Sequence, residues 1–98
     1  MNILEWFQNW YQSQCNGDWE HTFGVKINTI DNPGWSIEVN LEETEFENVV
    51  IEYKLVEKSE NDWYGLSVEN SLFKGVGDPS KLNLILEKFK EIIENGSK

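Results

Sequence analysis

One short segment carries the side-chain types needed for acid–base chemistry. His21, the only histidine of the chain, follows Asp18, Trp19 and Glu20. A carboxylate at Asp18 or Glu20 would orient the imidazole as a general base for a small cationic or neutral substrate. Such catalysis also needs a nucleophile or a second base, and the sequence contains no recognisable arrangement of either. We therefore interpret His21 as a strand-entry residue, assign no catalytic residue, and keep a small acid–base enzyme as an alternative function.

The sequence predicts neither a metal nor an organic cofactor. Cys15 is the only cysteine, so an intrachain disulfide is impossible and a structural zinc site would lack its usual thiolates. Its predicted position near a helix C-terminus disfavours a reactive thiolate. No acidic loop has the spacing of a calcium site, and Gly75-Val76-Gly77 is too short for a nucleotide-binding fingerprint.

The charge balance favours a basic protein as partner. Eighteen acidic residues face eight lysines without any arginine, and the formal net charge is −10. This balance argues against nucleic acids and anionic membranes as ligands, because both bind clustered cations. Eight acids but only two lysines lie between residues 42 and 62, which predicts a strongly negative sheet face and edge, with surface solubility as the alternative. The acids predicted to contact the partner are Glu38, Glu42, Glu43, Glu45, Glu52 and Glu69.

The tryptophans separate into two groups. Trp6, Trp10 and Trp35 fall in phase with apolar neighbours, which predicts core positions. Trp19 and Trp63 stand at predicted turn-to-strand junctions, and Trp63 falls on the face opposite to the apolar residues of its strand. We predict that Trp19 and Trp63 are exposed contacts for the partner, with capping of the core ends as the alternative.

The periodicity of apolar residues predicts a helix, several strands and a second helix. Helical spacing over residues 2–15 predicts the first helix, which Asn16-Gly17 ends. Asp78 followed by Pro79 predicts the start of the last helix, which Gly96 ends. Alternating apolar residues predict strands over residues 22–30, 35–42, 49–57, 63–69 and 72–77.

These elements predict an α+β fold, an antiparallel meander sheet of four to five strands with the N-terminal and C-terminal helices packed on one face. The other face would meet water or a partner. In the third strand, Val49, Ile51, Tyr53 and Leu55 are predicted to share one face.

The whole chain, residues 1–98, is predicted to form one domain. Its first residues lack the pattern of a signal peptide, and no apolar stretch is long enough to span a bilayer, so we expect a cytoplasmic protein. We expect a monomer or a weak homodimer paired through an exposed edge strand.

Four segments of the chain resemble the immunity protein 53 family, in the same order and spacing over nearly the whole chain. The segments are Trp6…Trp10-Tyr11, Gly17-Asp18-Trp19-Glu20-His21, Asp31-Asn32-Pro33-Gly34-Trp35-Ser36 and Ser59-Glu60-Asn61-Asp62-Trp63. The resemblance implies an α+β immunity protein of a bacterial polymorphic toxin system, encoded beside a toxin gene, that binds and neutralises the toxin domain. It implies no cofactor and no catalytic residues, and it supplies no contact residues. An adaptor for another basic protein remains a further alternative.

Overall fold

A computed structural model describes residues 1–95 and confirms the α+β fold. The helices are α1 (Ile3–Gln14), the short α2 (Trp19–Thr22) and α3 (Leu82–Asn95). The strands are β1 (Val25–Ile30), β2 (Gly34–Asn40), β3 (Ile51–Ser59), β4 (Asp62–Glu69) and β5 (Leu72–Gly77). Gly96, predicted to end the last helix, lies outside the described residues. Within residues 1–95, no helix is both long and apolar enough to cross a membrane.

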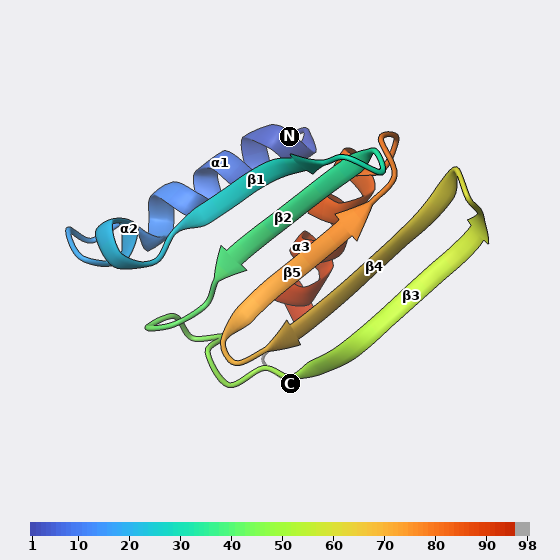
Figure 1. The fold of residues 1–98 in the computed structure, drawn as a ribbon. Helices are drawn as coiled ribbons and strands as arrows, with labels where there is room; N and C mark the ends of the chain where they lie inside the picture. The colour runs from blue at the N-terminus through green and yellow to red at the C-terminus, as the bar shows by residue number, and fades with distance from the viewer. Residues whose placement is uncertain (96–98) are drawn as a thin grey trace.

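The five strands form one antiparallel sheet in the order β1-β2-β5-β4-β3 (Figure 1). A meander that followed chain order throughout would place β3 beside β2. Instead, residues 41–50 carry the chain to the far edge, and β3, β4 and β5 return as successive hairpins until β5 pairs with β2. The connection is far longer than a tight hairpin turn, so it does not force its two strands to be neighbours. β1 and β3 are the edge strands.

Helices α1 and α3 lie behind the same face of the sheet, as predicted (Figure 1). This covered face contributes Ile37, Val39, Val68 and Phe73, none of which has exposed surface. The ring of Phe89 on α3 lies 4.9 Å from that of Phe73, centroid to centroid. Figure 1 shows no helix over the opposite face, which we call the open face.

Helix α3 begins later than the sequence predicts, because Asp78 closes a turn instead of capping the helix. The Asp78 carboxylate accepts hydrogen bonds from the backbone N–H groups of Ser80 and Trp63, each at 2.8 Å. The first helical bond runs from the N–H of Ile85 to the carbonyl of Lys81, at 2.9 Å. Asp78 therefore joins the start of α3 to β4, an attachment between two elements that are far apart in the sequence.

Candidate partner-binding surface

The middle of the open face is not acidic, which corrects the prediction of a strongly negative face, although Glu38 projects from this face as predicted. Glu38 on β2 stands opposite Lys26 on β1 and opposite Lys74 on β5. The Lys74 ammonium lies 4.0 Å from the Glu38 carboxylate. Because two lysines flank one glutamate, this row carries a net positive charge. Reversal of Glu38 would place three lysines side by side and would disturb the sheet as well as any partner contact.

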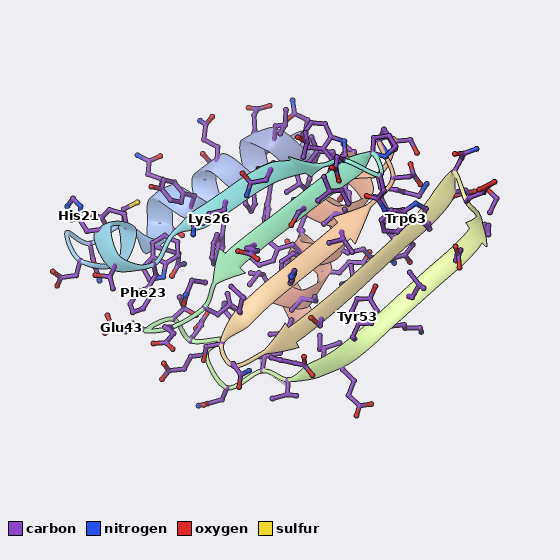
Figure 2. All side chains as sticks on the ribbon, in the orientation of Figure 1. His21, Phe23, Lys26, Glu43, Tyr53 and Trp63 are labelled. Atoms are coloured by element: carbon purple, nitrogen blue, oxygen red, sulfur yellow. The ribbon has the colours of Figure 1, made fainter. Side chains whose placement is uncertain are left out.

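The predicted acids gather instead at the end of the sheet where β2 and β4 finish. Residues 41–50 cross this end and are held by Leu41, which has no exposed surface, and by Phe46, which is 4% exposed. Figure 2 shows Glu43 at this end. We call this surface the acidic end, and its exposed members are Glu42, Glu43, Glu45, Glu47 and Glu69.

Hydrogen bonds give the acidic end a defined shape. The Thr44 hydroxyl donates to the Leu41 carbonyl at 2.7 Å and accepts from the Phe46 N–H at 3.1 Å. The backbone of Glu43 adopts a positive φ of 62°, and its N–H donates to the Glu47 carboxylate at 3.1 Å. A carboxylate on an ordered loop loses less conformational entropy when a partner binds, so this shape suits recognition.

Ser71 ties the acidic end to the turn between β4 and β5. The Ser71 hydroxyl donates to the Glu47 carbonyl at 2.7 Å, and the Ser71 carbonyl accepts from the Leu41 N–H at 2.7 Å. Asn70 and Ser71 have φ values of 54° and 61°. Two consecutive positive φ values are typical of a tight two-residue hairpin turn. The turn thereby fixes both ends of the acidic segment.

We expect Ser71→Ala to loosen the acidic end while the sheet stays folded. The variant removes the hydroxyl donor to the Glu47 carbonyl, and one such bond contributes about 1 kcal/mol. Amide hydrogen exchange measured by NMR should accelerate by about fivefold for residues 42–48 and remain unchanged in β2 and β5. Ser36→Ala on β2 serves as the control. Equal exchange rates in both variants would show that Ser71 does not hold this loop.

A β-bulge near the start of β3 displaces its register against β4. Ile51 pairs with Val68, whereas Lys54 pairs with Leu66, so β3 holds one extra residue between the two pairs. Glu52, predicted as a partner contact, is exposed within this bulge. It therefore lies on an edge strand and apart from the segment that carries most of the acidic end.

The bulge also reverses the predicted orientation of Tyr53 and Leu55. Both were predicted to share a face with Ile51, but they project from the open face and are 56% and 49% exposed. The ring of Tyr53 lies over Gly65 on β4, where any side chain would collide with the tyrosine hydroxyl. Simple alternation missed these two residues, because one inserted residue shifts every later side chain of the strand to the other face.

Trp63 lies on the open face, as the alternation of β4 predicts. It is half-buried, and with Tyr53 and Leu55 it lines a hollow of about 510 Å³. Figure 2 shows Tyr53 and Trp63 over β3 and β4, at the opposite side of the view from His21. An aromatic ring that is partly open to solvent remains available to a partner.

Trp19 is a core residue, which corrects its prediction as an exposed contact. The side chain is 1% exposed, and its ring lies edge-on to Trp10 with 6.0 Å between the centroids. The ring of Tyr11 also packs against Trp19, with 5.7 Å between the ring centroids. The predicted turn-to-strand junction is instead the short helix α2, which directs Trp19 onto α1. No acceptor among the described residues reaches its indole N–H.

The residues before His21 form a turn that the Glu20 side chain stabilises. His21 is exposed on α2, and β1 begins only at Val25, later than predicted. The Glu20 carboxylate accepts the backbone N–H groups of Asn16 at 3.0 Å and Gly17 at 2.9 Å. Hydrogen bonds from backbone N–H groups hold the pKa of the Glu20 carboxyl below its usual value. The N–H of Glu20 itself contributes most, and those of Asn16 and Gly17 contribute less. Within residues 1–95, no three side chains of the metal-binding types come together.

A second hollow lies between α3 and the start of β3. It has a volume of about 630 Å³, and its wall includes Val50, which is 72% exposed. Its charged lining residues are Glu45 and the pair of Lys88 and Glu91, whose ammonium and carboxylate lie 3.9 Å apart. The apolar wall consists of Val49, Val50, Ile51, Leu66 and Ile92.

Most of this chain matches a known protein family. A family model described as Immunity protein 53 matches residues 4–94. No curated protein and no solved structure matches the chain. The matched range takes in all five strands and nearly all of α1 and α3, so it covers both the open face and the acidic end.

Proposed function

The chain belongs to the immunity protein 53 family, and on that basis we propose that it binds and neutralises a cognate bacterial toxin domain. The observation that carries this proposal is the family match over residues 4–94. The toxin belongs to a polymorphic toxin system, and neutralisation takes place in the cytoplasm of the cell that makes both proteins. The role is one of binding, with no catalytic step.

The acidic end supports the proposal as the surface that first meets the toxin. Its carboxylates stand on a segment that Leu41, Phe46 and Ser71 hold in one shape. The chain as a whole carries a net charge of −10. A concentrated negative field attracts a basic partner over distances near the Debye length, about 10 Å at moderate salt, and so accelerates encounter.

A toxin that cleaves nucleic acid would need a basic active site to hold phosphates. For such a toxin, the acidic end would enter that site and offer carboxylates in place of phosphate groups. The rigid connection of residues 41–50 favours this mode, because its carboxylates need little reorganisation on binding. Neutralisation would then consist of direct occlusion.

We expect charge reversal at the acidic end to slow association with the toxin. Glu42→Lys, Glu45→Lys and Glu69→Lys each replace a steering carboxylate by a cation, and each should lower the association rate constant by about threefold to tenfold at low salt. Wild-type association should slow by about tenfold between about 0.02 M and about 0.5 M NaCl. Stopped-flow fluorescence with the toxin domain encoded beside the gene measures both effects.

Glu87→Lys on α3 makes the same charge change at an exposed position outside the acidic end. It should slow association much less than the three reversals. A salt-independent association rate, or equal slowing by Glu87→Lys, would contradict steering by the acidic end.

His21→Ala should protect cells against the toxin as well as the wild type does. Loss of a turnover activity in a folded His21→Ala protein would instead support the enzyme alternative.

A further inference from the structure

The hollow beside Trp63 has the composition of a cation-binding site. We call it the Trp63 hollow. Trp63 forms one wall and Tyr53 another, on neighbouring strands of the open face (Figure 2). The turn between β1 and β2 reaches it through Asn32. Its lining residues on β3, β4 and the turn between them are Tyr53, Leu55, Glu57, Glu60, Asn61 and Trp63.

Both aromatic walls of the hollow project from paired strands of the sheet. Tyr53 is 56% exposed, yet its ring lies across Gly65, where the absence of a side chain leaves room for it. The backbone of Trp63 is fixed by a hydrogen bond, because its N–H donates to the buried carboxylate of Asp78 at 2.8 Å. Because the sheet already orders the backbone that carries the two rings, a ligand does not have to order that backbone.

The charge of the hollow is negative and unbalanced. Glu57 and Glu60 line it, and no lysine does. Neither carboxylate forms an ion pair with a lysine of residues 1–95. The nearby Lys81 already forms ion pairs with other residues, because its ammonium lies 2.8 Å from a carboxylate oxygen of Asp62 and of Asp78. A cation entering the hollow would therefore meet two available carboxylates.

We propose that the Trp63 hollow binds an arginine side chain presented by the toxin. A guanidinium is planar and can stack on an aromatic ring while its five N–H donors reach carboxylate and amide oxygens. Tyr53 and Trp63 supply the rings, Glu57 and Glu60 the carboxylates, and Asn61 an amide oxygen. This proposal rests on the proposed function for the identity of the partner and adds the chemistry by which that partner is recognised.

Two other surfaces do not combine aromatic rings with unpaired carboxylates. The row of Lys26, Glu38 and Lys74 on the open face is net positive. The hollow at Val50 is lined by Glu45 as well as by the paired Lys88 and Glu91, and no aromatic ring lines it. The combination of rings and unpaired carboxylates therefore favours the Trp63 hollow over these two surfaces as the site for a basic segment.

The first test uses a small probe and does not depend on the toxin. Uniformly ¹⁵N-labelled protein is titrated with N-acetyl-arginine methylamide, and N-acetyl-citrulline methylamide serves as the neutral isostere. We expect saturable shifts of the Trp63 indole N–H and of backbone amides in residues 53–63, with millimolar affinity for the arginine probe. Citrulline should bind about tenfold more weakly, because it lacks the charge.

Matched variants test whether the carboxylates that line the hollow bind the arginine probe. Glu57→Gln combined with Glu60→Gln should weaken the arginine probe to the level of citrulline, whereas Glu38→Gln elsewhere on the open face should not. Equal affinity for the two probes, or shifts confined to other parts of the chain, would overturn the proposal. A lysine probe that binds as tightly as arginine would overturn the assignment to a guanidinium.

The second test uses the toxin domain and separates the two proposals. Tyr53→Ala, and separately the paired Glu57→Gln and Glu60→Gln, should raise the dissociation constant by about tenfold or more in proteins whose folding is verified by circular dichroism. An unchanged constant would remove the Trp63 hollow from the interface and leave the proposed function intact. Absence of binding by the wild type would contradict the proposed function, and the probe titration would still decide the chemistry of the hollow.

Discussion

Phe89→Ala is expected to lower the free energy of unfolding by about 3–5 kcal/mol, the usual range for removal of a buried phenylalanine. Phe89 has no exposed surface and stands where the two helices meet the sheet. Its ring lies 5.0 Å from Trp10, 4.9 Å from Phe73, 5.7 Å from Phe7 and 6.1 Å from Trp6, between ring centroids. The alanine variant leaves a cavity bordered by four aromatic rings.

Urea unfolding followed by tryptophan fluorescence measures this effect. Phe89→Leu keeps most of the volume and should cost less than about half as much. Leu4→Ala, on a side chain that is 64% exposed, is the control and should change stability by less than about 0.5 kcal/mol. Equal losses in Phe89→Ala and Leu4→Ala would mean that α3 does not pack on the sheet as described.

Asp78→Ala is expected to lower the melting temperature by roughly 10 °C or more, because it removes one buried acceptor from several partly buried donors. Asp78 is 1% exposed. Its carboxylate accepts from the Lys81 ammonium at 2.8 Å, from the Ser80 hydroxyl at 2.6 Å and from the Trp63 N–H at 2.8 Å. In the variant, these donors lose the Asp78 carboxylate, and Lys81 retains the half-exposed Asp62 and the Ser80 hydroxyl.

The same carboxylate should govern part of the loss of stability in acid. The Lys81 ammonium, followed by the Ser80 hydroxyl, holds the pKa of Asp78 well below its usual range. In the unfolded chain this carboxyl titrates near its ordinary value of about 3.9, so the unfolded state takes up the proton at a higher pH. The contribution of Asp78 is therefore complete above about pH 5 and is lost as the pH falls below about 4.

Unfolding free energies measured between about pH 6 and about pH 2 test this assignment. The wild type should lose stability more steeply toward low pH than Asp78→Ala. Glu87→Gln, at an exposed position on α3, should keep the wild-type slope. An Asp78→Ala protein with the wild-type slope would place the acid sensitivity in other carboxylates.

Local patterns predicted most of the elements of this fold. The apolar face of α1 and the alternation in β2, β4 and β5 are direct consequences of one buried side, so their spacing is visible in the sequence. The strand order is not visible there, because residues 41–50 are long enough to reach either edge of the sheet. The start of α3 was misplaced, because Asp78 finds donors on β4 as well as within its own turn.

The candidate site was predicted less well than the fold. Glu42, Glu43, Glu45 and Glu69 were placed on the surface correctly, because acidic side chains in turns and at strand ends rarely become buried. The negative charge predicted around Glu38 is absent, because the register sets lysines on both sides of it. Tyr53 was missed because a bulge is an insertion relative to the partner strand, and a single strand read alone does not reveal it. Trp19 was misassigned because α2 has only four residues, too few to show helical periodicity in the sequence.

Isothermal titration of this protein with the toxin domain encoded beside its gene tests the central claim most directly. The immunity role predicts one-to-one binding with nanomolar affinity, and co-expression should protect cells from the toxin. The two proteins should first be shown to be folded by circular dichroism. No detectable binding between the folded proteins would contradict the immunity role for this pair.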